Sequence, residues 1–177
     1  MNELDGLDIL AYAFVLLKQR DTIPNLKLRI GGGYMSPDKK LVKQVKRTLK
    51  PYANDVVIED TNDMDEHADF YRKITVLTVP LRFQEGVGLY LCEAFAAGRP
   101  AVEPNTGSFA EIVGNGGLIY EPNDAHHLAD TLEKMLTDKQ CYQQCQSHAL
   151  TLAKERYDDM TAARRLTELY SELLKND

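Results

Sequence analysis

Two glutamates and two glycines are spaced along the stretch 83–100, FQEGVGLYLCEAFAAGRP, in a way that could bind a ligand. Glu85 directly precedes Gly86 and Gly88, and Glu93 follows within a segment that is otherwise apolar. Glycines at the start of a helix let the backbone approach a ligand, and the first N–H groups of the helix attract anions. The stretch therefore predicts a phosphate site. A tight turn that needs glycine at positive φ explains the two glycines equally well.

Glu93 is expected to lie just over one helical turn beyond Leu89, with its side chain directed back towards the helix start. An ionised carboxylate buried without a partner costs several kcal/mol, so it must meet a cation, donor groups or water. The hydroxyls of a ligand, such as a ribose diol, could supply those donors. A buried ion pair with Arg82 or Arg99 is the competing interpretation, and Glu93 taken alone favours it slightly.

An acid–base pair of the glycosidase type is a third use for these glutamates. In such enzymes the two carboxylates lie roughly 5–10 Å apart across one bond. Eight helical residues rise about 12 Å, although Glu85 is expected in a loop. The spacing of Glu85 and Glu93 suits contacts with two ends of a long ligand better than attack on a single bond.

The elements that must position these residues alternate between strand and helix. Strands are predicted at 26–30, 56–60, 75–80, 100–105 and 118–121, and helices at about 7–20, 36–50, 63–74, 89–97, 109–113, 124–138 and 138–175, with a break near 157–159. This order predicts an α/β fold, a doubly wound parallel sheet of the Rossmann-like kind with helices on both faces and the C-terminal helices packing at its end. Because the chain opens on a helix, a first strand is expected to be missing.

Two glycine-containing loops follow predicted strands. One is GGGYMS after LKLRI, and the other is RFQEGVG after TVLTVP. In doubly wound sheets ligands bind outside the carboxyl ends of the strands, where such loops lie. The ligand site is therefore predicted at that edge of the sheet.

Composition narrows the function classes. The chain has 177 residues with 44% hydrophobic residues, which is ordinary for one globular domain, and its net charge of −6 argues against a nucleic-acid binder. Three cysteines without a C-x-x-C pair and four scattered histidines predict free thiols and no metal site. There is no signal-peptide pattern or long apolar run, so a cytoplasmic location is expected.

The motif E-G-x-G-x-x-x-x-E from Glu85 to Glu93, followed by AFAAGRPAV, GSFAEIV and GLIYEPND, resembles the C-terminal domain of retaining glycosyltransferases of family 4, the group 1 family of GT-B architecture. The resemblance covers most of the chain. It implies one nucleotide-sugar-binding domain over 1–177, a UDP- or GDP-linked donor, no cofactor and no metal. It also implies an N-terminal acceptor domain that is absent here, and a role in assembling cell-surface polysaccharide.

The resemblance also implies roles for individual residues. Glu85 would be the catalytic residue that contacts the donor sugar near the reacting carbon, and Glu93 would hold the ribose hydroxyls. The remaining donor-binding residues that we expect are Gly31, Gly32, Gly33, Arg82, Gly86, Val87, Gly88 and Leu89.

The start of the chain departs from the family pattern. Members usually carry a strand with an arginine, and a lysine before the glycine of the first helix, both reaching the diphosphate. Here that strand is absent and Asp5 precedes Gly6. A carboxylate repels phosphate, so either these first residues are out of register or the donor site is weakened. This chain alone is predicted to be inactive.

Other functions stay open at this stage. The residues Gly31-x-Gly33-x-x-Ser36 half-fit a dinucleotide fingerprint, with Glu59 or Asp60 available for a ribose, which would suit an NAD-binding oxidoreductase. That interpretation leaves EGVGLYLCE unexplained, so it is a distant alternative. A non-catalytic nucleotide-sugar-binding or scaffold module, and a nucleotide-sugar epimerase, are nearer alternatives.

A row of lysines marks the predicted helix at 36–50. One face of this helix carries Lys39, Lys43, Lys46 and Lys50, opposite Leu41, Val45 and Leu49. Peripheral contact with an anionic membrane is one interpretation of this face. A solvated helix face is the more common explanation and is favoured.

Overall fold

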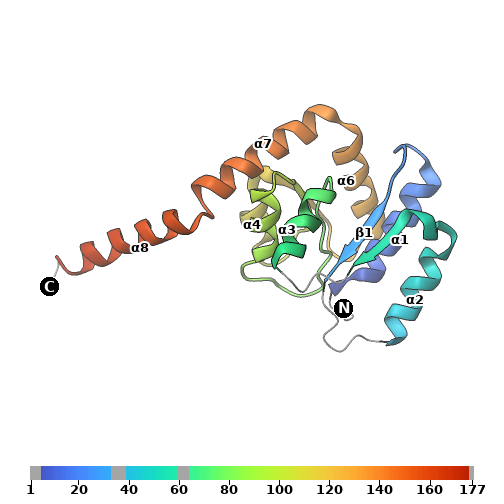
Figure 1. Cartoon of the computed structure of the whole chain (residues 1–177), viewed down its shortest axis with the longest axis horizontal. Coiled ribbons are helices and arrows are strands. Elements are labelled where there is room, and N and C mark those ends of the chain that lie inside the picture. The colour runs from blue at the N-terminus through green and yellow to red at the C-terminus, as the bar shows by residue number, and fades with distance from the viewer. Residues whose placement is uncertain (1–4, 33–38, 60–63, 176–177) are drawn as a thin grey trace.

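In the computed structural model, which describes residues 5–32, 39–59 and 64–175, strands and helices alternate along the chain (Figure 1). The strands are β1 (Leu28–Gly31), β2 (Val56–Glu59), β3 (Ala101–Pro104) and β4 (Gly117–Tyr120). The α-helices are α1 (Leu7–Arg20), α2 (Lys39–Leu49), α3 (Met64–Lys73), α4 (Leu89–Ala96), α5 (Phe109–Val113), α6 (Ala125–Thr137), α7 (Lys139–Glu155) and α8 (Asp159–Leu173). Two 3-10 segments, η2 (Lys50–Asp55) and η3 (Gly114–Gly116), precede β2 and β4. The predicted α/β fold is confirmed.

The strands form two short parallel sheets. β1 pairs with β2, and β3 pairs with β4. The predicted strand at 75–80 was wrong, because within the described residues this segment makes a single bridge, from Leu77 to Ala101. Leu77 donates its N–H to Pro100 at 3.0 Å and accepts from Val102 at 2.9 Å. Its other edge has no strand beside it among the described residues, so the ladder does not extend and the sheet is divided into two halves.

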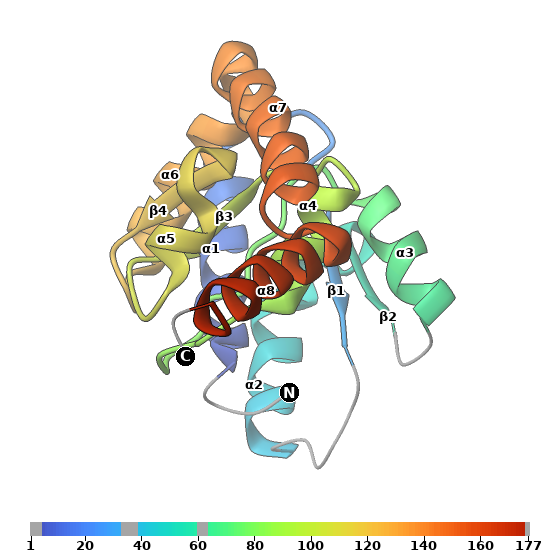
Figure 2. The same ribbon diagram turned by 90° about the vertical axis from the view of Figure 1, so that its left-hand side faces the viewer.

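Helices cover both faces of the β3–β4 half, as predicted for a doubly wound fold. All four residues of β3 are buried, and its neighbouring residues Ala101 and Val102 belong to two different core clusters. Val102 packs with α1 and α6, whereas Ala101 packs with α4, α5 and α7. Successive side chains of a strand point to opposite faces, so the two clusters lie on opposite sides of the sheet. Figure 2 shows α6 beside α1.

Local sequence patterns predicted the positions of the helices correctly in several places. The predicted spans 7–20 and 109–113 match α1 and α5, and the predicted break near 157–159 separates α7 from α8. α6 begins after Asp124, whose carboxylate caps the helix by accepting the N–H groups of His126 and His127 at 2.9 Å each. On α2, Leu41, Val45 and Leu49 are buried, as the lysine pattern required.

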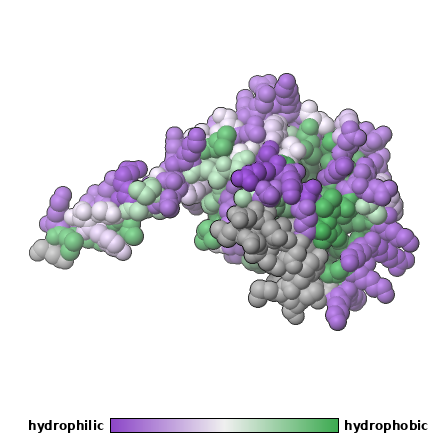
Figure 3. Space-filling view, viewed as in Figure 1, coloured by the Kyte–Doolittle hydropathy of each residue, from purple (hydrophilic) through white to green (hydrophobic). Residues whose placement is uncertain are grey.

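The two C-terminal helices behave differently. α7 packs against α4 and η3, as expected, and buries Cys145 and Ala149. α8 buries none of its residues and projects from the body (Figure 1), so the expected packing does not extend to it. Figure 3 shows apolar residues along this projection. Leu169 and Tyr170 are among the exposed large hydrophobic residues of α8. Across the described residues, no helix combines the length and the apolar character that crossing a bilayer requires.

The core contains one carboxyl group that sequence patterns did not single out. Glu103 in β3 is fully buried, and its Oε1 accepts the N–H of Val79 at 3.0 Å. Its Oε2 has no hydrogen-bond partner among the described residues. Burial raises the pKa of Glu103 well above its usual value. The folded structure therefore favours the neutral, protonated form of Glu103.

This shift predicts a pH-dependent effect of Glu103→Gln. In the unfolded chain the pKa of a glutamate is about 4.3. Between that value and the raised folded value, the folded state binds more protons, so wild-type stability falls as pH rises. Glutamine does not titrate, so the variant should gain stability relative to wild type between pH 5 and pH 8, by at most about 1.4 kcal/mol per pH unit. Urea unfolding at both pH values checks this, and a pH-independent difference would contradict it.

Candidate functional site

Glu93 lines a cavity of about 730 Å³ between β1 and the segment 74–79. Its side chain is 42% exposed, so the interpretation that this carboxylate is buried was wrong. The apolar run around it does not mean burial on all sides, because α4 directs Leu91 and Phe95 into the core and leaves Leu89 68% exposed. Glu93 is thus accessible to solvent and to a ligand.

The partners of Glu93 come from α3. The hydroxyl of Tyr71 donates to Glu93 Oε2 at 2.8 Å, and His67 Nδ1 lies 4.0 Å from the same oxygen. Burial, followed by the hydrogen bond to Glu93, raises the pKa of Tyr71 well above its usual value. Tyr71 therefore remains a neutral donor that orients the carboxylate. Sequence reasoning missed this contact, because nothing in the order of residues links position 71 to position 93.

The competing ion pair of Glu93 with an arginine was also wrong. Arg99 donates to the backbone carbonyls of Tyr71 at 3.0 Å and Arg72 at 2.9 Å. Arg82 makes a bidentate contact with Asp8, with both nitrogen–oxygen distances at 2.8 Å. This contact lowers the pKa of Asp8. The guanidinium of Arg82 is directed to the start of α1, and its role in donor binding stays a prediction.

The loop before α4 gathers N–H groups around an anion. Glu85 Oε1 accepts the N–H of Gly86 at 2.8 Å and that of Val87 at 3.3 Å. Consecutive N–H groups that converge on one negatively charged oxygen form an anion-binding concavity. A ligand phosphate could compete with the Glu85 carboxylate for the same donors. The predicted phosphate site therefore has suitable donors at this loop.

A second loop holds the first in place. Ser108 donates its N–H to the carbonyl of Glu85 at 3.2 Å, and its Oγ lies 2.9 Å from that carbonyl and 3.0 Å from the carbonyl of Gly86. Gly107 has φ +54°, and a Cβ there would lie 2.7 Å from the carbonyl oxygen of Glu85. Gly107 and Ser108, which the sequence analysis did not single out, thus support the loop that carries Glu85.

The two glycines of the motif do different things. Gly88 begins α4 at φ +60°, which confirms the turn interpretation for that residue. A Cβ on Gly86 would meet no atom within 4 Å, so packing does not demand a glycine there. Val87 and Leu89 are exposed at 59% and 68%. Gly86 leaves open space at the loop, as close approach of a ligand requires.

Gly86→Ala should separate folding from ligand binding. The added methyl group meets nothing in the protein, so the free energy of unfolding should change by less than about 0.5 kcal/mol. If a diphosphate packs against this backbone, the methyl group should weaken binding of a nucleoside diphosphate by about 5- to 100-fold. Binding of the matching nucleoside monophosphate should change less. Titration calorimetry measures both, and an unchanged diphosphate affinity would remove Gly86 from the site.

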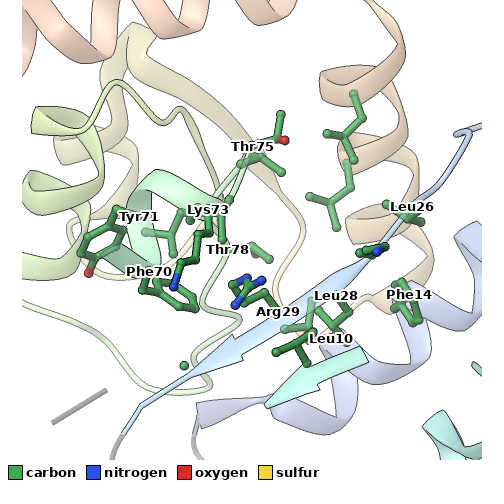
Figure 4. Close-up of a pocket in the computed structure, with 18 of the residues that line it drawn as sticks. Leu10, Phe14, Leu26, Leu28, Arg29, Phe70, Tyr71, Lys73, Thr75 and Thr78 are labelled. Carbon is green, nitrogen blue, oxygen red and sulfur yellow. The ribbon is translucent and has the colours of Figure 1, made fainter. Parts of the chain in front are cut away.

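The predicted nucleotide loop after β1 reaches the same cavity as Glu93. Gly31 and Gly32 line it, together with Tyr71 and Phe70 (Figure 4). A Cβ on Gly31 would lie 2.7 Å from the Phe70 ring, so glycine is needed there for packing. Gly33 lies outside the described residues. The structure thus brings Glu93 to Gly31 and Gly32, whereas Glu85, Arg82 and the loop 86–89 lie outside the described cavity lining.

The dinucleotide fingerprint finds less support. Glu59, one candidate for the ribose, is hydrogen-bonded to Arg29 across the β1–β2 pair, and this contact lowers the pKa of Glu59. Asp60, Gly33 and Ser36 lie outside the described residues. With Glu59 engaged by an arginine, an NAD site at this loop is disfavoured.

Two further predictions concern a metal ion and an anionic membrane. Among the residues that the structure describes, no three or more His, Cys, Asp or Glu side chains are grouped so that they could hold a metal ion. The lysine face of α2 is exposed at Lys39, Lys43, Lys46 and Lys50, which fits a solvated helix face. Contact of this face with a membrane stays a prediction.

The comparisons with known proteins agree with this geometry. Residues 1–138 match the family model of group 1 glycosyl transferases. D-inositol 3-phosphate glycosyltransferase from Corynebacterium efficiens is 28% identical over 175 residues, which cover 94% of this chain and 40% of that protein. The lipopolysaccharide core biosynthesis mannosyltransferase LpsB from Rhizobium meliloti is 28% identical over 111 residues, covering 60% of this chain and 31% of that protein. The chain therefore spans about two fifths of its full-length relative.

Solved structures share the fold. HepE from Anabaena, solved in complex with UDP-glucose, superposes with a TM-score of 0.81 at 20% identity, covering 97% of this chain and 46% of that chain. The C-terminal domain of the group 1 family protein LpcC from Francisella tularensis superposes with a TM-score of 0.76 at 17% identity, covering 90% of this chain and 84% of that chain.

Proposed function

Because the chain belongs to the group 1 glycosyl transferases, we propose that it is the donor-binding domain of an enzyme that transfers a glycosyl group from a nucleotide sugar to an acceptor. One observation carries the proposal. The Glu93 carboxylate, exposed and oriented by Tyr71, faces the cavity that Gly31 and Gly32 also line. An ionised carboxylate that accepts from a neutral donor keeps acceptor positions for the two hydroxyls of a ribose.

The remaining parts of the site suit a diphosphate and a sugar. We assign the diphosphate to the N–H groups at 86–88, at the start of α4, and the donor sugar to Glu85. In the reaction, the bond from the anomeric carbon to the diphosphate oxygen breaks, and an acceptor hydroxyl oxygen bonds to that carbon with retention of configuration. The hydroxyl gives up its proton, which passes to the departing diphosphate. Negative charge grows on the departing diphosphate, where the N–H groups would stabilise it. Positioning and electrostatics supply the catalysis, and no metal is required.

The acceptor and the whole enzyme are part of the same proposal. We assign acceptor binding to an N-terminal domain that this chain does not contain, since the chain spans 40% of its full-length relative. On that basis the chain alone should not turn over. We propose a UDP- or GDP-linked donor, by analogy with HepE, which was solved with UDP-glucose, and with the mannosyltransferase LpsB. We also propose that the acceptor belongs to the assembly of a polysaccharide or a lipid-linked glycan. We place the enzyme in the cytoplasm, with Lys39, Lys43, Lys46 and Lys50 available to an anionic membrane.

Titration calorimetry of the chain with UDP, GDP, UDP-glucose, GDP-mannose and NAD tests the proposal. A nucleotide sugar should bind more tightly than its nucleoside diphosphate, because the sugar adds the contact with Glu85. Binding of NAD alone would favour the oxidoreductase, and binding of none of the five would refute a donor site in this chain.

A non-catalytic binding module is the second candidate, favoured by the Asp8–Arg82 contact. That contact engages a guanidinium that a diphosphate would otherwise attract. The two candidates differ in one measurement. A donor domain should bind the nucleotide sugar more tightly than the diphosphate, whereas a module that binds only the nucleotide should show equal affinities for the two.

A further inference from the structure

We propose that Glu103 is a positioning residue for the donor site, because its buried carboxyl group fixes the start of the loop 80–88 against β3. This loop carries Glu85 and the N–H groups of Gly86 and Val87. Glu103 acts on the loop through the hydrogen bond that its Oε1 accepts from the Val79 N–H at 3.0 Å. The inference rests on the proposed function only where it concerns donor binding, since the position of the loop can be measured without a donor.

The backbone hydrogen bonds between the segment 74–79 and β3 end just before the loop. Leu77 donates its N–H to the carbonyl of Pro100 and accepts the N–H of Val102. In a parallel pair the next bonds would join the Val79 N–H to the Val102 carbonyl, and the N–H of residue 104 to the Val79 carbonyl. Residue 104 is a proline, which has no N–H. The ladder therefore cannot hold Val79 in the way that it holds Leu77.

The backbone groups of Val79 have other partners. Its N–H donates to Glu103 Oε1, and its carbonyl accepts the N–H of Leu81 at 2.7 Å in a tight turn over Pro80. An N–H that is shielded from water without an acceptor costs free energy comparable to a lost hydrogen bond. The Glu103 carboxyl thus takes the place of a backbone acceptor where the chain leaves the sheet and enters the loop.

The turn after β3 holds the same loop further along. The Ser108 hydroxyl contacts the carbonyls of Glu85 and Gly86, and the Ser108 N–H donates to the Glu85 carbonyl. This turn is itself tied to β4, because the Asn105 N–H donates to the Tyr120 carbonyl at 2.8 Å. One continuous segment, 103–108, therefore holds the loop both at its start and at Glu85.

The burial of Glu103 is costly, and its bond to Val79 is what offsets the cost. The side chain is fully buried, and Oε2 has no hydrogen-bond partner among the residues that the structure describes. An apolar side chain of similar size would avoid this desolvation. Burial raises the pKa of Glu103, which favours the neutral form. A neutral carboxyl group can accept the Val79 N–H without adding negative charge beneath a loop that binds a diphosphate.

The test compares variants of the whole chain with wild type. Glu103→Gln keeps an acceptor in the same place, whereas Glu103→Met keeps the length of the side chain and removes the acceptor. Thr131→Val is the matched control, because it removes another buried side-chain hydrogen bond, from the Thr131 hydroxyl to the His127 carbonyl in α6. Loss of a buried hydrogen bond is therefore common to Glu103→Met and Thr131→Val, and only the first loss lies at the loop.

NMR of the donor-free chain gives the first readout. In Glu103→Met, amide exchange at Val79 should quicken about tenfold relative to Leu77, because Leu77 keeps its backbone acceptor. The amide resonances of Gly86 and Val87 should shift in the same variant. Glu103→Gln and Thr131→Val should keep the wild-type positions of these loop resonances.

Titration calorimetry with UDP-glucose and GDP-mannose gives the second readout. The donor that wild type binds should bind to Glu103→Met about tenfold more weakly, and to the other two variants within about threefold of wild type. Binding of neither donor by wild type would count against the proposed function, and the loop resonances of the donor-free chain would still decide the role of Glu103.

Two results would overturn the inference. Unchanged resonances of Gly86 and Val87 in Glu103→Met, with only a lower free energy of unfolding, would make Glu103 a core residue without a role at the loop. Equal shifts in Glu103→Gln would show that the acceptor does not hold the loop. If Glu103→Met does not fold, Glu103→Asp replaces it. Its carboxyl is one methylene shorter, so it must pull Val79 towards β3 or lose the bond, and unshifted loop resonances would again contradict the proposal.

Discussion

Glu93→Gln should weaken binding of the nucleotide sugar by about 30- to 1,000-fold, which corresponds to about 2–4 kcal/mol. The carboxylate offers acceptors to two hydroxyls, and hydrogen bonds to a charged group are worth about 1.5–3 kcal/mol each. Glutamine keeps the shape but loses the charge and one acceptor. Because the side chain is 42% exposed, the free energy of unfolding should change by less than about 0.5 kcal/mol. Calorimetry and urea unfolding of the same preparation measure the two quantities.

Two variants serve as controls for Glu93. Glu172→Gln makes the same change of charge on the projecting α8 and should leave binding unchanged. Tyr71→Phe removes the hydroxyl that orients Glu93 but no contact with the ligand itself, so it should weaken binding by only about 3- to 10-fold. A Glu93→Gln protein that binds the nucleotide sugar as tightly as wild type would remove the ribose contact from the proposed function.

Gly107→Ala should lower both stability and donor binding. Alanine is strained at φ +54°, and its Cβ would lie 2.7 Å from the carbonyl oxygen and 2.8 Å from the nitrogen of Glu85. Relief requires the loop that carries Glu85 to move away from Ser108. We expect a loss of about 2–3 kcal/mol in unfolding free energy and at least about a tenfold loss of nucleotide-sugar affinity. Urea unfolding and calorimetry provide the measurements.

Gly114→Ala is the matched control for this loop. Gly114 also has a positive φ, of +47°, but the nearest atom to its Cβ would be a methyl carbon of Leu152 at 3.7 Å. At φ +47° and ψ −127°, alanine is strained but meets no backbone atom, so this variant should lose about 1–3 kcal/mol of stability and keep its affinity for the donor. Equal losses of stability in the two variants, with affinity unchanged in both, would show that Gly107 does not support the site.

The sequence by itself determined the helices and the order of the elements. The apolar spacing at Leu7, Leu10, Phe14 and Leu17 matches α1, and the cap at Asp124 matches the start of α6. These signals are local, because helix hydrogen bonds and caps join residues three or four positions apart. The glycine motif before α4 was readable for the same reason, and it led to the family resemblance that the match over residues 1–138 confirms.

Only the tertiary structure decided the surroundings of the site. Tyr71 reaches Glu93 across 22 positions, and Ser108 reaches Glu85 across 23, and no local pattern encodes such distances. Whether Glu93 is buried depends on which elements pack beside α4. The apolar residues around it in the sequence therefore led to the wrong prediction that its carboxylate is buried. Segment 74–79 has the composition of a strand, but a strand also needs hydrogen-bonding neighbours on its edges. The β-propensity of a segment is set by its own residues, whereas the pairing of strands depends on the assembled fold. Strand pairing determined both the division of the sheet and the cavity within it.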